Sequence, residues 1–175
     1  PGRTGDRDVR MLRREARTLA ALDHPGFPRL LDQDLDGEPA WIVMSQVDGP
    51  HLSDLVREYG PIDVEQAVPL ARDVAEALAH LHDRGRVHLD VKPSNIVMGA
   101  RPVLLDLGAS RTIDRAAGLS AGVGTLTYLS PEQADPDRFG PPGPWSDVWG
   151  LGVALLRAAT GTNPLIARRG DERPD

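Results

Sequence analysis

The sequence predicts a single α+β domain, or part of one, over its 175 residues. Apolar residues recur at helical spacing in stretches that begin near residues 7, 64 and 146. Two pairs of short apolar runs, each pair separated by a turn sequence, predict β-hairpins that lie between these helices. Helices and strands therefore occupy separate stretches of the chain, which is the pattern of an α+β fold.

The composition excludes several classes of function. The net charge of −6 gives no general attraction to nucleic acid or to anionic membranes, so we expect neither as a partner. The absence of cysteine excludes disulfides, thiolate zinc sites and cysteine nucleophiles. No apolar run approaches the roughly 20 residues that a membrane span needs, and no signal-peptide pattern is present. We expect a cytoplasmic chain, and because it begins with Pro1 we expect further sequence before it.

The first 60 residues predict a helix, a hairpin and a second, shorter helix. Residues 1–8 are polar and glycine-rich and predict a loop. A helix over about 7–22 is predicted from the apolar positions Val9, Leu12, Ala16, Leu19 and Ala20. Strands are expected at 29–35 and 40–45 around a turn at Asp36-Gly37, followed by a short helix at 52–58.

The longest helix is predicted after Asp63, which forms a capping box with Gln66. Its apolar stripe runs to Gly85, and Pro69 is expected to bend its first turns. His82 ends this stripe, so we expect its side chain to lie in the core or at its boundary.

The second half predicts two short strands, a long irregular segment and a last helix. Strands at 95–98 and 102–106 flank a tight turn. Residues 109–131 show no regular period, and 134–144 indicate an exposed connection. Ser146 is expected to cap a helix over 146–160, in which Gly150 and Gly152 predict a closely packed neighbouring backbone. The charged tail from Ala167 is expected to be mobile.

Four polar residues near these two strands supply the parts for phosphoryl transfer. Asp90, Lys92 and Asn95 lie in the run HLDVKPSNIV, and Asp106 ends the next strand. Asn95 and Asp106 are oxygen ligands of the kind that suits Mg²⁺. Lys92, the only lysine of the chain, would face phosphoryl oxygens, while Asp90 would accept a hydroxyl proton. Ordinary loop carboxylates remain the alternative on these residues alone.

Six motifs in order resemble those of eukaryotic-type bacterial serine/threonine protein kinases and cover almost the whole chain. The motifs are EARTLAALDHPGFPRLLD (15–32), WIVMSQVDGPHL (41–52), HLDVKPSN (88–95), DLG (106–108), GTLTYLSPEQ (124–133) and SDVWGLGV (146–153). The resemblance implies a two-lobed kinase-like fold that is incomplete at both ends. It comprises a partial small β lobe over 1–45 and a partial, mostly helical large lobe over 46–175. The hinge would lie near 45–48 and the activation segment at 106–132.

The resemblance also implies roles for individual residues. Asp90 would be the catalytic base, Lys92 would contact the γ-phosphate of ATP, and Thr125 would bond near Asp90. Asn95 and Asp106 would hold Mg²⁺. Glu15, by itself an ordinary solvated glutamate, would pair with an ATP-anchoring lysine.

Further implied roles concern the adenine pocket and the internal framework. The backbones of Ser45 and Val47 would bond adenine, with Met44 behind the ring and Val97 below it. Asp147 would accept hydrogen bonds from the catalytic-loop backbone. A hydrophobic spine is implied for Leu19, Leu30, His88 and Leu107. The acceptor would be a serine or threonine hydroxyl of a protein.

Departures from the family pattern keep alternatives open. Neither a glycine-rich phosphate loop nor an ATP-anchoring lysine precedes Glu15, so the chain is expected to be an incomplete catalytic unit. Leu89 stands where the family has an arginine that pairs with a phosphorylated activation loop, which predicts that loop phosphorylation is not a strict switch. The alternatives are a pseudokinase that acts as scaffold or nucleotide sensor, and a small-molecule phosphotransferase.

Overall fold

A computed structural model describes residues 2–166 of the protein, with side chains from residue 8 onward. The helices are α1 Gly2–Leu19, α2 Leu52–Tyr59, α3 Val64–Asp83, α4 Ile113–Ala117, α5 Pro131–Ala134, α6 Pro136–Phe139 and α7 Pro144–Thr160. The strands are β1 Leu30–Asp34, β2 Trp41–Met44, β3 Arg86–Val87, β4 Ile96–Met98, β5 Pro102–Leu104 and β6 Arg111–Thr112. The predicted α+β class is confirmed.

The strands form three separate antiparallel pairs among the described residues. β1 pairs with β2 to make the predicted first hairpin, with a register shift after Leu30. β4 pairs with β5 to make the second hairpin, in which Ile96 lies opposite Leu104. β3 pairs with β6, which places Arg86 opposite Thr112 and joins the start of the loop between β3 and β4 to the segment after Asp106.

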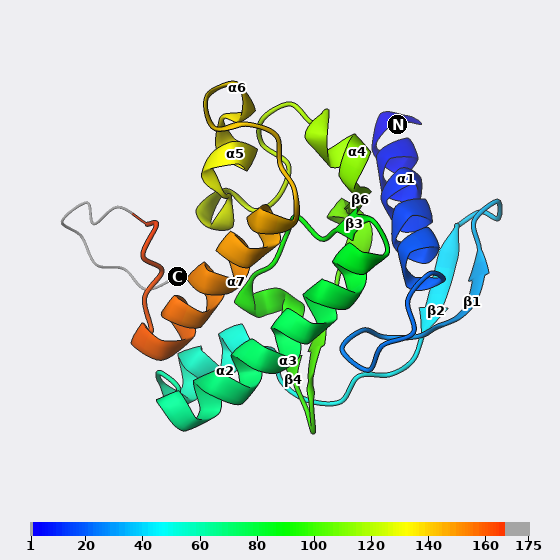
Figure 1. The fold of residues 1–175 in the computed structure, drawn as a ribbon. Helices are drawn as coiled ribbons and strands as arrows, with labels where there is room; N and C mark the ends of the chain where they lie inside the picture. The colour runs from blue at the N-terminus through cyan, green and yellow to red at the C-terminus, as the bar shows by residue number, and fades with distance from the viewer. Residues whose placement is uncertain (1, 167–175) are drawn as a thin grey trace.

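The long helices α3 and α7 pack against each other at the centre of the molecule (Figure 1). α1 lies at one edge beside the β1–β2 hairpin, and the short helices α5 and α6 lie beyond the N-terminal end of α7 (Figure 1). The β4–β5 hairpin lies below α3 in this view, and the turn at Pro93–Asn95, in the loop between β3 and β4, contacts α2 and α7 (Figure 1). This loop carries Asp90, Lys92 and Asn95.

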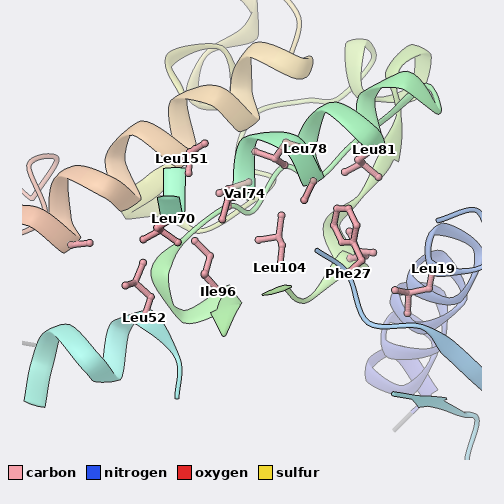
Figure 2. Packing of buried hydrophobic residues seen from close by; sticks show 14 of the residues in the cluster. Leu19, Phe27, Leu52, Leu70, Val74, Leu78, Leu81, Ile96, Leu104 and Leu151 are labelled. Atoms are coloured by element: carbon pink, nitrogen blue, oxygen red, sulfur yellow. The ribbon is translucent and has the colours of Figure 1, made fainter. Parts of the chain in front are cut away.

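One hydrophobic cluster joins these elements (Figure 2). Its largest contribution comes from the apolar stripe of α3, as the period predicted. Labelled members in Figure 2 include Leu19, Phe27, Leu52, Leu70, Val74, Leu78, Leu81, Ile96, Leu104 and Leu151. Because Leu19 and Phe27 belong to α1 and the loop after it, the N-terminal part shares its core with α3 and α7.

The start of α3 agrees with the prediction in detail. The side chain of Asp63 accepts a hydrogen bond from Gln66 N at 2.8 Å, and Gln66 Oε1 accepts one from Asp63 N at 3.3 Å. These two bonds satisfy backbone donors that have no partner within the helix. α3 continues through Pro69 and ends at Asp83, two residues before Gly85.

The predicted bounds of the first helix were wrong at both ends. α1 begins at Gly2, within the stretch predicted as a loop. A helix that has formed can extend beyond its apolar stripe, because each added residue contributes one more backbone hydrogen bond. It ends at Leu19 rather than residue 22. The amides of Ala21 and Leu22 bond the carbonyls of Thr18 and Leu19, three residues back, and this tighter turn closes the helix.

The segment 109–144 is more regular than predicted. It contains β6, α4, α5 and α6. Side chains cap the short helices: Ser130 Oγ accepts from Gln133 N at 3.3 Å, and Asp135 Oδ1 accepts from Arg138 N at 3.2 Å. Helices of four or five residues contain too few apolar positions to show a period, so the sequence predicted an irregular segment there.

The prediction that Ser146 caps the last helix was also wrong. α7 begins at Pro144, a residue suited to the first helical position, and Ser146 lies in the first turn. Its hydroxyl accepts from Gly143 N at 3.1 Å and donates to Glu132 Oε1 at 2.7 Å, so it links α7 to α5.

Within residues 2–166, no helix has the length and hydropathy needed to cross a bilayer. The tail from Ala167, predicted to be mobile, lies outside the described residues.

Candidate active site

The buried carboxylate of Asp147 holds the loop between β3 and β4 in place. Asp147 Oδ2 accepts from His88 N at 2.8 Å, and Asp147 Oδ1 accepts from Leu89 N at 2.7 Å. The predicted role of Asp147 is therefore confirmed. His82 Nε2 lies 2.7 Å from Asp147 Oδ2, so this histidine of α3 holds the same carboxylate. Three partners compensate for burying the charge of Asp147.

The glycines of α7 have different surroundings. A Cβ atom built on Gly150 would lie 2.9 Å from the carbonyl oxygen of Val91, which confirms that a neighbouring backbone, that of the loop between β3 and β4, packs against this position. Nothing lies within 4 Å of a Cβ built on Gly152, so the predicted close neighbour is absent there. Gly152 is exposed to solvent.

His88 is completely buried and ties the loop to the strand that leads to Asp106. Its Nδ1 accepts from Asp90 N at 3.3 Å, so the hydrogen is on Nε2, which lies 3.1 Å from the carbonyl oxygen of Leu105. The structural role predicted for His88 fits this pattern. Leu19 and Leu107 belong to the hydrophobic cluster and Leu30 packs against it.

Asp90 is at the centre of the polar contacts in the site. Oδ1 accepts from the backbone N and the hydroxyl of Thr125, at 2.9 and 2.6 Å. Oδ2 lies 2.7 Å from Lys92 Nζ and accepts from Asn95 Nδ2 at 3.3 Å. Lys92 Nζ also donates to Thr125 Oγ1 at 2.7 Å. The structure thus brings together four of the predicted site residues: Asp90, Lys92, Asn95 and Thr125.

These contacts determine the ionisation of Asp90. Burial alone would raise its pKa, but the hydrogen bonds from Lys92 and Thr125 outweigh burial and lower the pKa below its ordinary value. The carboxylate is therefore ionised at neutral pH and acts only as a hydrogen-bond acceptor.

Asn95 and Asp106 lie at the same end of the β4–β5 hairpin. The carbonyl oxygen of Asn95 accepts from Leu105 N at 2.7 Å, immediately before Asp106. Asp106 has a left-handed backbone, with φ of 62°, and is exposed at the surface. Asn95 uses its Nδ2 atom to bond Asp90, which leaves its Oδ1 as a candidate ligand.

These two oxygen donors fit Mg²⁺, which binds few protein ligands and keeps waters and phosphate oxygens. No cluster of three His, Cys, Asp or Glu side chains suited to a metal is present in the described part of the chain. The donor set thus fits a metal that binds together with a phosphate substrate, and does not fit a metal held by protein groups alone.

Glu15 faces this end of the site from α1. Burial and then the negative charge of Asp106 raise its pKa, and a hydrogen bond with the backbone of Leu107 opposes the rise. Glu15 therefore lies beside the proposed metal ligand Asp106, where a cation would relieve the repulsion between the two carboxylates.

The four predicted adenine contacts are not gathered around one cavity. Val97 is buried in β4, whereas Met44 is exposed at the end of β2. A cleft of about 600 Å³ contains Ser45 and Val47 but neither Met44 nor Val97. Ser45 N donates to the carbonyl oxygen of Arg29 at 2.8 Å, so its amide is already used, while its carbonyl remains available.

Two parts of the site were not found in the sequence. His82 was read as a core or boundary residue, because nothing local to it indicates a carboxylate 65 residues away in the chain. Gln133 donates to the carbonyl oxygens of Leu89 and Val123 at 2.9 and 2.8 Å and so fastens the segment before Thr125. A Cβ on Gly124 would lie 2.7 Å from the same Leu89 oxygen, which explains the glycine.

Comparison with known proteins gives a consistent result. The family described as "Protein kinase domain" matches residues 3–174. A Thermomonospora curvata protein named "Probable serine/threonine-protein kinase PkwA" is 40% identical over 142 residues, 79% of this chain and 19% of its own. The serine/threonine-protein kinase PknB of Mycobacterium leprae is 38% identical over 163 residues, 88% of this chain and 26% of its own.

A third relative, the serine/threonine-protein kinase pkn2 of Myxococcus xanthus, is 36% identical over 163 residues, 87% of this chain. This chain spans 19 to 26% of the length of these curated relatives.

Proposed function

The chain belongs to the protein kinase family, and we propose that it is part of a catalytic unit that transfers the γ-phosphoryl group of ATP to serine or threonine hydroxyls of proteins. The observation that carries this proposal is the arrangement around Asp90. Its carboxylate is ionised and is held in one orientation by Thr125, Lys92 and Asn95. Asp90 lies in the loop that leads into the β4–β5 hairpin, and Asp106 follows the end of this hairpin by two residues.

Asp90 would orient the acceptor hydroxyl. A carboxylate with a lowered pKa is a weak base, so its first effect is to accept a hydrogen bond and fix the direction of attack. The hydroxyl proton passes to Asp90 as the new bond to phosphorus forms and the bond to the ADP oxygen breaks. Thr125 holds Oδ1 through two donors, so Oδ2, which Lys92 also contacts, would be the oxygen that faces the reacting groups.

Lys92 would provide positive charge next to the transferred group. In the structure its Nζ lies between Asp90 Oδ2 and Thr125 Oγ1, each at 2.7 Å. An ammonium in this position can keep one carboxylate contact and turn another donor toward a phosphate oxygen. Mg²⁺, when bound, would neutralise charge on the donor phosphates, and Asn95 and Asp106 are the residues that would hold it.

Ser45 and Val47, which line one cleft, would contact adenine there, and Met44 and Val97 would contact it from outside that cleft. The hinge would lie at 45–48 and the activation segment at 106–132. Glu15 would pair with a lysine that anchors ATP. We place the proposed activity in the cytoplasm.

The assay that tests this proposal identifies which acceptor becomes phosphorylated. The full-length protein is incubated with Mg²⁺ and γ-labelled ATP, together with a serine/threonine protein substrate, a tyrosine peptide and a set of small-molecule alcohols. We expect label on serine or threonine, turnover in the range of about 1–100 s⁻¹, and loss of labelling when EDTA removes the metal. Label on the small alcohols alone would indicate a small-molecule phosphotransferase. ATP binding without transfer to any acceptor would indicate a pseudokinase.

A further inference from the structure

Gln133, on α5, has a buried side-chain amide that links three segments of the chain. The residue is only 5% exposed. Its Nε2 atom donates to the carbonyl oxygens of Leu89 and Val123, at 2.9 and 2.8 Å. Its Oε1 atom accepts from the backbone N and the hydroxyl of Ser130, each at 3.2 Å. A glutamine amide has two hydrogens and one oxygen with two lone pairs, so every hydrogen-bonding position of this side chain is used.

These partners determine the direction of the amide. A backbone N–H can only donate and a backbone carbonyl can only accept, so Oε1 faces Ser130 and Nε2 faces Leu89 and Val123. The main chain of Gln133 is held as well. Its N donates to Ser130 Oγ at 3.3 Å, and its carbonyl oxygen accepts from Gly122 N at 3.0 Å. The amide therefore has one orientation and starts from a fixed point of the backbone.

The bond to Leu89 acts on the peptide group that leads into Asp90. Leu89 has a left-handed backbone, with φ of 68°, which is strained for a bulky side chain. Its N donates to Asp147 Oδ1 at 2.7 Å and its carbonyl accepts from Gln133, so a side chain holds each end of this residue. Because the Leu89 carbonyl and the Asp90 N–H belong to one planar peptide group, Gln133 helps to set the direction in which Asp90 leaves the main chain.

The bond to Val123 acts on the residue that holds the Asp90 carboxylate. Val123 lies two residues before Thr125, whose N and hydroxyl donate to Asp90 Oδ1 at 2.9 and 2.6 Å. Between them, a Cβ built on Gly124 would lie 3.1 Å from Gln133 Nε2, so the backbone passes directly over the amide. One amide thus holds both the backbone that carries the carboxylate and the backbone that donates to it.

Apolar packing alone does not give this alignment. Leu89 is buried in a small cluster with Val87 and Ala116, and Val123 packs against the cluster. Such contacts bring two segments together without preferring a direction, whereas hydrogen bonds to the two carbonyl oxygens are directional. Gln133 therefore supplies the orientation that the cluster lacks.

We propose that Gln133 is a positioning residue for phosphoryl transfer, which keeps Thr125 bonded to Asp90 Oδ1 and leaves Oδ2 to the acceptor hydroxyl. This inference rests on the function proposed for Asp90. The side-chain hydrogen bonds of Gln133 go to neither of the proposed metal ligands, and Gln133 does not line the cleft that contains Ser45 and Val47. Loss of its amide should therefore slow the transfer step and leave ATP binding unchanged.

Two variants separate the roles of the two ends of the amide. Gln133→Glu keeps an oxygen for the N–H and the hydroxyl of Ser130, but replaces the donor with an oxygen that faces two carbonyl oxygens. Burial beside these oxygens should raise the pKa of the introduced carboxyl, which on protonation can donate one of the two lost bonds. Gln133→Met keeps the length of the side chain without a strong hydrogen-bonding group.

The first experiment measures single-turnover transfer from ATP·Mg²⁺ to a serine/threonine protein substrate by the full-length protein. At pH 8 we expect Gln133→Glu to lower the rate about tenfold or more, because misplacing a reacting group by about 1 Å can cost about 10²-fold. At pH 6 the difference should narrow as the introduced carboxyl takes up a proton, while the dissociation constant of ATP stays within about twofold at both pH values. Gln66→Glu makes the same change in the capping box of α3 and should keep the full rate.

A second set of measurements does not depend on transfer. Burial raises the pKa of Asp90 and the hydrogen bonds from Lys92 and Thr125 lower it, so loosening the Thr125 contact in Gln133→Met should raise the Asp90 pKa, as followed by NMR of its carboxyl carbon. In the unaltered protein, the side-chain amide hydrogens of Gln133 should exchange with solvent about 10²-fold more slowly than those of Gln66, which is exposed.

Three results would overturn the proposal. The first is a folded Gln133→Glu variant that transfers phosphate at the unaltered rate at pH 8. The second is a rate that falls equally at pH 6 and pH 8 together with weaker ATP binding, because that pattern indicates a general loss of structure. The third is an Asp90 pKa that is unchanged in Gln133→Met.

The exchange measurement keeps the proposal testable even if neither variant folds. Side-chain amide hydrogens of Gln133 that exchange as fast as those of Gln66 would contradict the hydrogen bonds on which it rests. Neither this measurement nor the Asp90 titration needs an acceptor substrate. Absence of transfer by the unaltered protein, which would refute the proposed function, is therefore distinguishable from failure of this inference.

Discussion

Two carboxylates with different surroundings define the site at the scale of single residues. Asp147 is buried and receives three hydrogen-bond partners, so it acts as a fixed support for the backbone of His88 and Leu89. Asp90 lies one residue further along, partly open, and receives its donors from Thr125, Lys92 and Asn95. The first carboxylate holds the loop in place, and this leaves the second free to engage a substrate.

Glu15 gives a prediction about pH. Burial and the charge of Asp106 raise its folded pKa above the ordinary 4.5, so the folded state binds more protons than the unfolded state between these two values. The stability that Glu15 contributes is thus fully present below pH 4.5 and is lost as the pH rises through the raised pKa. Glu15→Gln removes the charge and keeps the shape, so we expect it to raise the melting temperature at pH 7 and to change it little at pH 4.

Melting curves of this chain and its Glu15→Gln variant between pH 4 and 8 provide the measurement. Glu58→Gln, an exposed glutamate near the end of α2, is the control and should have little effect. A lower melting temperature of Glu15→Gln at pH 7 would mean that a cation rather than Asp106 controls this carboxylate.

At the residue scale the sequence predicted the parts of the site whose signal is local. Asp90, Lys92 and Asn95 lie within six consecutive residues, and the structure brings Thr125 to them as the motifs implied. His82 and Gln133 could not be predicted, because their roles depend on partners 65 and 44 residues away.

At the scale of elements, two glycines of α7 differ in their surroundings and can be compared with each other. Gly150→Ala would place a methyl group 2.9 Å from a backbone oxygen of Val91, and overpacking of this kind costs about 1–3 kcal/mol. Gly152→Ala meets open space and gains about 1 kcal/mol in helix propensity.

We therefore expect Gly150→Ala to lower the unfolding free energy and Gly152→Ala to raise it, as measured by urea unfolding of the two variants. Each variant is the control for the other, because both make the same change in the same helix. Equal effects of the two would show that the catalytic loop does not pack on α7 at Gly150.

The segment before Thr125 is held by an apolar cluster around Leu89. Val87, Leu89 and Ala116 are buried there, with Ile113, Leu119 and Val123 packed against them. Leu89→Ala would remove most of this contact and cost about 2–5 kcal/mol. We expect the variant to be cleaved faster by proteases within 113–124, as mapped by mass spectrometry.

Leu126→Ala is the matched control, since Leu126 is 83% exposed and belongs to no cluster among the described residues. If Leu89→Ala and Leu126→Ala are cleaved at the same rate, the apolar cluster does not order this segment. The prediction from Leu89 that loop phosphorylation is not a strict switch would then lose support.

The sequence predicted a helix correctly where a long apolar period and a capping residue mark it. It missed the helices that are only four or five residues long. α3 has a capping box and an apolar stripe over twenty residues, so its start and face were predictable. α4, α5 and α6 have four or five residues each. Ser130 and Asp135 cap α5 and α6, whereas α4 has no side-chain cap and contacts β3 and β6. The beginning of α7 was misplaced by two residues, because Ser146 resembles a cap but bonds Glu132 instead.

At the scale of the molecule, one core connects the N-terminal part to the large helical part. Phe27 is buried beside Leu19 and Leu81, and the carbonyl of neighbouring Gly26 accepts from Leu104 N at 2.8 Å (Figure 2). A Cβ on Gly26 would lie 2.6 Å from Ala77 Cβ, so the loop after α1 sits directly on α3. The position of α1, and with it Glu15, therefore depends on α3.

Phe27→Ala tests this connection. Removing a buried phenylalanine costs about 3–5 kcal/mol of unfolding free energy, and both α1 and α3 should be destabilised. We expect faster amide hydrogen exchange in α1 and in α3 of the variant. Phe139→Ala, at a position 53% exposed in α6, should leave both helices unchanged. Faster exchange confined to α1 would contradict a shared core.

The central claim is that the ionised, triply held carboxylate of Asp90 carries phosphoryl transfer. The most direct test is single-turnover transfer from ATP·Mg²⁺ to a serine/threonine protein substrate by the full-length protein and its Asp90→Asn variant. The variant should lose at least about 10²-fold in rate while ATP binding changes little, because Asn cannot take the hydroxyl proton. Asp137→Asn, at an exposed position in α6, should retain the full rate. An Asp90→Asn variant that transfers phosphate as fast as the unaltered protein would contradict the account.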